Sequence, residues 1–127
     1  MEILTHQKTD HSLCGKAVKS EEGFSRAELF TTENMAVDSS GLVHGGFIFG
    51  LADYAAMIAV NHPNVVLGSA DVKFLKPVKI NETVVAEARV ISKEGKKQKV
   101  SVIVEKNGEK VFEGNFICFT LDKHVLS

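Results

Sequence analysis

The longest apolar run of the chain extends from Phe47 to Asn61 and contains a single charged residue, Asp53. Pro63 follows this run, and proline disfavours helical geometry in the residue before it. A run that is apolar on all sides predicts a buried helix. Glycines and one histidine precede it, in residues 41–46. The sequence therefore predicts a central helix around which the rest of the chain is organised.

Most of the remaining chain alternates between apolar and polar residues, which is the period of a strand that buries one face. Five segments show this alternation: residues 23–32, 65–75, 83–92, 99–106 and 111–121. Asn107-Gly108 predicts a tight hairpin, because both residues tolerate positive φ. We expect the four strands after the helix to form an antiparallel meander. The predicted fold is therefore α+β, with a curved antiparallel sheet of five or six strands wrapped around one helix.

Residues 1–127 are expected to form one domain, since this length is sufficient for a single core. Residues 1–12 are mixed in character and are expected to form a short helix or a loosely packed arm. A sheet of five or six strands has two exposed edges, which pairing between copies would cover. We therefore expect a homodimer at least.

The composition, 44% hydrophobic and 24% charged, is typical of a globular protein. A net charge of −1 and dispersed basic residues argue against nucleic acid as a partner. No segment reaches the roughly 18–20 apolar residues that span a bilayer. The first ten residues are polar and lack the apolar centre of a signal peptide. We expect a cytoplasmic protein in which Cys14 and Cys118 are reduced core residues.

Asp53 is the main candidate for chemistry, because a carboxylate within an apolar helix is costly to ionise unless it is paired, hydrated or used in a reaction. Helical spacing places four residues on its side of the helix: Gly46, Phe49, Gly50 and Met57. The two glycines would leave a groove there, at a cost to helix stability of roughly 1 kcal/mol each relative to alanine. The alternative is a structural Asp53 paired with a loop amide or a partner chain.

The amides of Gly45 and Gly46 are expected at the start of the helix, where backbone N–H groups have no intrahelical acceptor and the helix dipole is positive. Such donors can stabilise a developing oxyanion. Asp53 lies about 10–12 Å further along the helix axis. One chain therefore cannot easily direct both groups at one carbonyl. We expect a composite site, with the amides from one subunit and the carboxylate from its twin.

Other common sites find no support in the sequence. The glycine spacing in residues 41–50 matches neither the dinucleotide-binding fingerprint nor the phosphate-binding loop. The five histidines show no metal-binding spacing; they are His6, His11, His44, His62 and His124. We expect no metal and no cofactor.

The chain resembles the HotDog-fold thioesterases and is most similar to the PaaI-type acyl-CoA thioesterases. The likeness covers roughly residues 13–121 and rests on three segments: Gly41-Leu42-Val43-His44-Gly45-Gly46, Leu51-Ala52-Asp53 with Ala55-Ala56, and Phe74-Leu75-Lys76-Pro77-Val78. It implies hydrolysis of an acyl-CoA to a free acid and coenzyme A. It also implies a homotetramer built as a dimer of dimers.

The resemblance also implies roles for individual residues. Asp53 would act as general base or nucleophile, the Gly45 amide would polarise the thioester carbonyl, and His44 would order the turn. From the helical spacing described above, we also expect a groove lined by Gly46, Gly50 and Met57, and this groove would hold the acyl portion.

Two further residues are weaker candidates for substrate contacts. Asp38 stands six residues before His44, where many relatives have asparagine or glutamine, and it cannot donate a hydrogen bond as an amide can. It is equally interpreted as a turn residue. Ser69 follows the helix, in a region where some relatives carry a hydroxyl group.

Two other functions use the same fold. A non-catalytic module would bind acyl-CoA without cleaving it, although binding alone gains nothing from a buried carboxylate. A hydratase or dehydratase would also pair an acidic residue with a histidine, but the glycine-rich turn fits the thioesterase pattern better. Lys96, Lys97 and Lys99 are interpreted as a solvated turn, with contact to the phosphates of coenzyme A as the alternative.

Overall fold

The structure, a computed structural model, describes residues 1–127. Six strands form one antiparallel sheet in the order β1-β2-β4-β5-β6-β3. The strands are β1 (Lys16–Glu21), β2 (Phe24–Phe30), β3 (Val65–Phe74), β4 (Thr83–Glu94), β5 (Lys97–Lys106) and β6 (Glu109–Thr120). The helices are α1 (His11–Cys14), the 3₁₀ turn η1 (Glu33–Met35) and α2 (Gly45–Val60).

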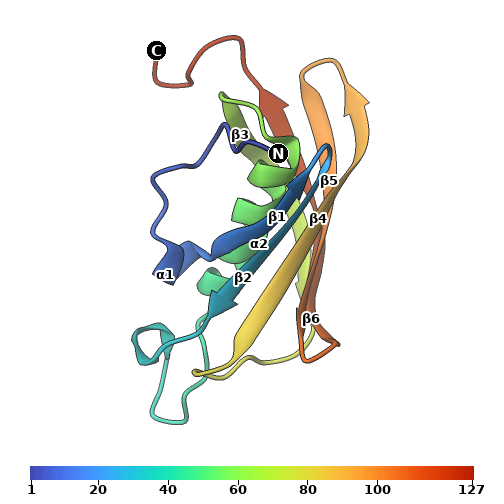
Figure 1. Cartoon of the computed structure of the whole chain (residues 1–127). Coiled ribbons are helices and arrows are strands. Elements are labelled where there is room, and N and C mark those ends of the chain that lie inside the picture. The colour runs from blue at the N-terminus through green and yellow to red at the C-terminus, as the bar shows by residue number, and fades with distance from the viewer.

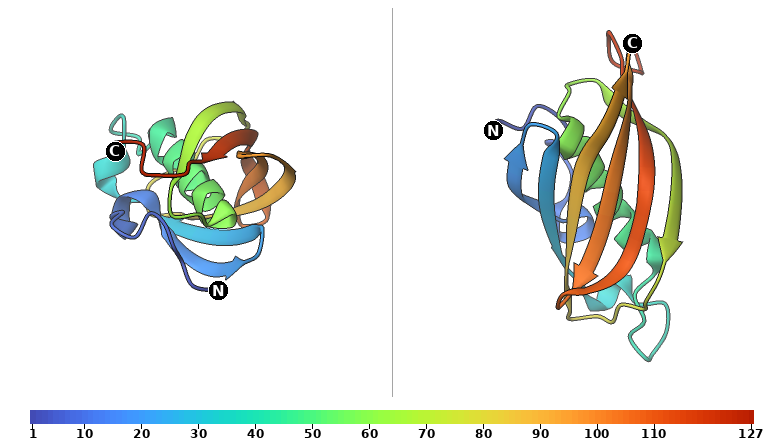
Figure 2. Two further views of the ribbon diagram at one scale, coloured as in Figure 1. Left: turned by 90° about the horizontal axis from the view of Figure 1, so that it is seen from above. Right: turned by 90° about the vertical axis from the view of Figure 1, so that its right-hand side faces the viewer.

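The sheet curves around α2, and α1 lies on the other side of that helix (Figure 1). Seen from above, the strands curve around part of α2 (Figure 2). The expected α+β arrangement, one curved antiparallel sheet around one long helix, is confirmed, and it is the HotDog fold. No helix in the structure combines the length and apolarity that crossing a membrane requires.

The core lies between α2 and the concave face of the sheet. The apolar positions of the predicted alternations point into it, and Ala86, Val102 and Phe116 are fully buried. Nine residues of α2 are also buried, so the helix is covered on most of its surface. This burial agrees with the helix that the apolar run predicts, and it leaves only a narrow open face.

Local interactions define both ends of α2. At the start, the His44 side chain accepts a hydrogen bond from the Gly46 N–H through Nδ1 (2.7 Å). At the end, Asn61 adopts the left-handed conformation (φ 52°), and its N–H donates to the Met57 carbonyl (2.8 Å). Left-handed caps of this kind end many helices.

Two features of the sheet differ from the sequence expectation. The first strand of the sheet, β1, was missed, because its residues are mostly exposed and charged and give little apolar alternation. The four strands after α2 do not form one meander, because β3 pairs with β6 and β4 pairs with β2. Residues 75–82 carry the chain across the end of the sheet, from β3 to β4 (Figure 2).

The N-terminal arm is held to the end of α2. The Leu4 N–H donates to the Asn61 side-chain oxygen (2.8 Å), and the Asn61 side-chain amide donates to the Glu2 carbonyl (2.7 Å). Further along, Asp10 caps the single turn of α1 by accepting from the Ser12 N–H. The arm is therefore fixed at its beginning by Asn61 and leads into the short helix α1 at His11.

Candidate active site

Asp53 is half-buried on α2, and no group of its own chain forms a hydrogen bond or ion pair with it. Burial raises the pKa of Asp53 to about 6, with no neighbouring donor or positive charge to offset that effect. A carboxylate with a pKa near the working pH is suited to general base catalysis. The structural alternative, pairing with a loop amide of the same chain, is not present.

The face of α2 beside Asp53 is open at two glycines. Gly46 is exposed, and a Cβ built on Gly50 would meet no atom within 4 Å. Met57 is different: it is only 1% exposed and belongs to the hydrophobic core. The single chain therefore offers a shallow surface at the glycines but no groove wall at Met57, because Met57 is buried in the core.

At the start of α2, one of the two backbone N–H groups expected to be free, that of Gly46, already donates a hydrogen bond within the chain. The Gly46 N–H donates to His44 Nδ1, so only the Gly45 N–H is left without a partner in the chain. This corrects the expectation that both amides are free. A Cβ on Gly46 would lie 2.8 Å from His44 Nδ1. The bond requires Nδ1 to be unprotonated, so a neutral His44 carries its hydrogen on Nε2.

An apolar cavity of about 360 Å³ opens beside Gly45. It is lined by Val43, Gly45, Ile48, Phe74, Leu75, Lys76, Pro77, Val78 and Val111. A Cβ on Gly45 would lie 3.1 Å from the Phe74 ring, which also makes an edge contact with Phe112 (5.1 Å between centroids). Sequence reasoning missed this cavity. The one local signal is the apolar pair Phe74-Leu75, which interrupts the alternation at the end of β3.

Asp38 and Ser69 are not brought to Asp53 by the single chain. Asp38 Oδ1 accepts from the N–H groups of Ser40 (3.0 Å) and Leu42 (3.4 Å), so its side chain stabilises the turn before α2. Ser69 pairs with Ile117 and points outward, in the same row of β3 as Asp71. The turn role of Asp38 is present in the structure, whereas substrate contacts by either residue stay predictions.

The two thiols of the chain lie within electrostatic reach of Asp53. Burial, with the Asp53 charge as the smaller cause, raises the pKa of Cys118 to about 12. Burial also raises the pKa of Cys14, to which the charges of Asp10 and Asp53 contribute. Both cysteines are free. These shifts keep both thiols protonated and argue against a cysteine nucleophile, since the thiolate is the reactive form.

Gly45 and Asp53 do not converge within one chain. They lie eight residues apart on one straight helix, which corresponds to about 12 Å along its axis. No cavity of the chain is lined by Asp53. A site that uses both groups on one carbonyl therefore needs a second copy of the chain.

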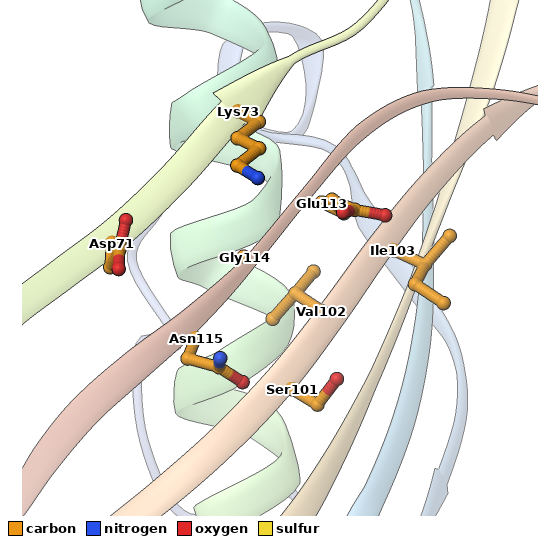
Figure 3. A pocket seen from close by; sticks show the side chains of 8 residues that line it. All are labelled: Asp71, Lys73, Ser101, Val102, Ile103, Glu113, Gly114 and Asn115. Carbon is orange, nitrogen blue, oxygen red and sulfur yellow. The ribbon is translucent and has the colours of Figure 1, made fainter.

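A second hollow of about 360 Å³ lies on the outer face of the sheet, with α2 behind the strands (Figure 3). Its polar side chains come from β3, β5 and β6, and include Asp71, Lys73, Ser101, Glu113 and Asn115. Glu113 is paired with Lys110 (3.1 Å). The sheet separates this hollow from Asp53 and from the start of α2, so it is not part of the same site.

The lysines considered for the phosphates of coenzyme A lie at the β4–β5 turn. Lys96 pairs with Asp122 (2.5 Å), and this contact lowers the pKa of Asp122. Lys97 and Lys99 are exposed at the start of β5. The structure therefore favours the interpretation of a solvated turn for Lys96.

Comparison with known proteins supports the fold and assigns the family. A solved structure of an uncharacterised protein, PH1136 from Pyrococcus horikoshii, is 53% identical, with a TM-score of 0.99 over 100% of this chain and 98% of that one. The PaaI protein of the Escherichia coli phenylacetic acid degradation operon is 22% identical, with a TM-score of 0.80 over 88% of this chain and 83% of that one. At that identity the likeness shows the fold alone.

Two curated relatives are longer proteins. The chain is 55% identical over 116 residues to methylthioribose-1-phosphate isomerase of Aquifex aeolicus, covering 91% of this chain and 25% of that protein. It is 30% identical over 119 residues to the transcription factor FapR of Thermoanaerobacter sp., covering 93% of this chain and 60% of that protein. The chain thus spans less than two thirds of the length of either relative.

The sequence profile described as the thioesterase superfamily matches residues 40–113, which include His44, Gly45, Asp53 and Phe74. This match covers more than half of the chain and contains the whole of α2. With the fold described above, it shows that this chain belongs to the thioesterase superfamily.

Proposed function

We propose that this chain is an acyl-CoA thioesterase whose site combines Asp53 of one copy with the Gly45 amide of another. The observation that carries the proposal is the half-buried Asp53, which has a raised pKa and no partner in its own chain. A carboxylate left uncompensated in this way costs stability, which is the mark of a group kept for a reaction. Membership of the thioesterase superfamily gives the class of that reaction.

The reaction needs one base and one oxyanion donor. The Asp53 carboxylate takes a proton from water while the water oxygen bonds to the thioester carbonyl carbon. The carbonyl oxygen becomes an oxyanion that accepts a hydrogen bond from the Gly45 N–H. Collapse of this intermediate breaks the carbon–sulfur bond, and the proton on Asp53 passes to the leaving thiolate. The products are the free acid and coenzyme A.

In a second form of the mechanism, Asp53 attacks the carbonyl carbon directly. The carbon–sulfur bond breaks, coenzyme A leaves as the thiolate, and a transient mixed anhydride forms. Water then hydrolyses the anhydride, which releases the free acid, regenerates the Asp53 carboxylate and supplies the proton that the thiolate takes up. Both forms use the same two groups and need no metal or further cofactor. A single oxyanion donor is typically worth 10²–10³-fold in rate.

His44 is a positioning residue in this scheme. Its Nδ1 accepts a hydrogen bond from the Gly46 N–H at 2.7 Å, and the backbone N–H of His44 donates to the Met35 carbonyl at 2.9 Å. These bonds fix the turn at the start of α2 and leave the Gly45 N–H as the donor available to substrate. Gly46 and Gly50 keep the helix surface beside Asp53 low, so that a second copy and the substrate can approach.

The free edge of β3 is the better of the two edges for pairing between copies. It presents ten residues, of which two are charged (Asp71 and Lys73). Strand β1 has only six residues, and three of them are charged (Lys16, Lys19 and Glu21). Charged residues on an edge strand oppose pairing with another strand. We therefore propose a homodimer joined through β3, and a dimer of such dimers as the complete assembly.

The test is steady-state hydrolysis of a panel of acyl-CoAs by wild type and Asp53→Asn. Loss of the base is expected to lower kcat by about 10²–10⁴-fold. Glu105→Gln removes an exposed carboxylate on β5, away from both sheet edges, and serves as the control. Equal rates for wild type and Asp53→Asn would show that Asp53 has no role in the reaction.

A second candidate function is binding without turnover. It is favoured by the FapR relative, a transcription factor that matches 93% of this chain. Binding of acyl-CoA by wild type with no release of coenzyme A would support this function. An absorbance assay with enoyl-CoA separates both possibilities from a hydratase.

A further inference from the structure

The groove predicted along α2 does not form a pocket in the single chain. The apolar cavity beside Gly45 is such a pocket. Its volume of about 360 Å³ falls within the roughly 300–1,000 Å³ of small-molecule pockets. Its walls come from the segment before α2, the start of α2, the end of β3 with the residues after it, and β6. The unpaired Gly45 N–H belongs to one of these walls.

Several polar groups in the walls are already paired with one another. The Val43 N–H donates to the Val78 carbonyl (2.8 Å), and the Leu75 N–H donates to the Val111 carbonyl (2.8 Å). The one charged lining residue, Lys76, has its ammonium 3.9 Å from Glu109. A ligand segment that carries amides would give up hydrogen bonds to water here, whereas a hydrocarbon chain would give up none.

We propose that this cavity holds the hydrocarbon part of the acyl group and that Phe74 limits its length. The inference rests on the proposed function, in which the Gly45 N–H holds the thioester carbonyl. A carbonyl at Gly45 places the attached acyl chain at the cavity, while the sulfur and coenzyme A extend away from it. Pantetheine contains two amides and is the less suitable occupant.

Phe74 is placed to act as the wall that sets the length. Its side chain is 56% exposed, so it is not required to fill the core. Its ring lies close to Gly45 and makes an edge contact with Phe112. Leu75 follows it in the same lining and is 41% exposed. Both residues can therefore be changed without opening the buried core.

The test uses variants with opposite expected effects. Phe74→Ala removes the wall, and Leu75→Trp adds bulk to the same lining. Phe30→Ala is the matched control, because Phe30 also ends a strand, is 55% exposed, and does not line the cavity. The measurement is kcat/KM for a series of straight-chain acyl-CoAs from acetyl-CoA to palmitoyl-CoA.

We expect kcat/KM to rise about fourfold for each methylene that the pocket accepts and then to stop rising. Phe74→Ala should move that limit to longer chains, and Leu75→Trp should move it to shorter chains. Phe30→Ala should leave the limit unchanged. If Phe74→Ala instead lowers kcat/KM by the same factor for every acyl-CoA, the cavity holds the pantetheine part of the substrate and the proposal is overturned.

The proposed function can fail without deciding this inference. If wild type hydrolyses no acyl-CoA, the same variants are compared by dissociation constants for S-alkyl-CoA thioethers of increasing length. Opposite shifts in the preferred length would still support the cavity as the site of the hydrocarbon chain. If wild type does hydrolyse acyl-CoAs and both variants keep its preference, the cavity assignment is wrong and the thioesterase proposal stands.

Discussion

Replacing Asp53 with asparagine is expected to stabilise the protein at neutral pH. Burial raises the pKa of Asp53 to about 6, and no partner in the chain compensates the charge. The folded state therefore holds the proton more tightly than the unfolded state. As pH rises from 4 through 6, the folded state loses stability relative to the unfolded state, because it must release a proton that it binds well.

The magnitude follows from the size of the shift. A pKa about 2 above the ordinary aspartate value corresponds to about 3 kcal/mol once the group is fully ionised. Asp53 is half-buried rather than fully buried, so solvent screening reduces this figure. We expect Asp53→Asn to raise the free energy of unfolding by about 1–3 kcal/mol at pH 7.5, and by much less at pH 4.5.

The assay is urea denaturation at both pH values, with all samples at one protein concentration because an oligomer's stability depends on it. The control is Glu105→Gln, which removes an exposed carboxylate from the inner strand β5 and should change stability by no more than about 0.5 kcal/mol. If Asp53→Asn proves less stable than wild type at pH 7.5, the carboxylate is a structural group with a partner. The functional interpretation of its burial would then be refuted.

Three other changes test separate parts of the site. The kcat/KM of wild type should fall as pH drops through about 6, because protonated Asp53 cannot accept a proton, and a pH–rate profile that stays flat down to pH 5 would contradict this. His44→Ala should cost about 1 kcal/mol of stability through loss of the helix cap, measured by urea denaturation; an unchanged midpoint would show that the cap contributes nothing. Gly50→Ala should raise the stability of the isolated fold by about 1 kcal/mol through helix propensity, since its Cβ meets nothing, yet lower hydrolysis if a second copy or substrate packs there. Full activity in this variant would show that the open face is not used.

The helix and most strands could be predicted because their signals are local. The apolar run that becomes α2 and the alternating positions of β4 and β5 are buried as expected. The placement of β3 beside β6 could not be predicted, because the pairing of strands depends on contacts between segments that are distant in the sequence. The edge strand β1 could not be predicted either, because none of its side chains is fully buried and it therefore needs no alternation of apolar residues.

The site shows the same division between local and distant information. Asp53 could be found because it is the single charge in an apolar run. The hydrogen bond from the Gly46 N–H to the His44 ring at the start of α2 could not be predicted. Histidine is not among the preferred capping residues, and the orientation of its ring depends on packing. Met57 lies about 40° around the helix from Asp53, and it is buried in the core there. The cavity at Gly45 joins four segments that no local pattern connects.

A composite site can be tested with two inactive variants that fail for different reasons. Asp53→Asn removes the base, and Gly45→Pro removes the N–H donor. Proline is favoured at the first position of a helix, and His44 before it already has a compatible ψ of 130°. Gly45→Ala is the control, because it adds the same Cβ beside Phe74 while keeping the N–H.

The most direct measurement is acyl-CoA hydrolysis by the two inactive variants, alone and after they are unfolded and refolded together. In a mixed dimer, one site receives an intact Asp53 and an intact Gly45 amide, and the other site receives neither. A site shared between copies predicts recovery to about a quarter of wild-type activity after random mixing. If the mixture stays as inactive as its components while Gly45→Ala remains active, the two groups do not act together across an interface.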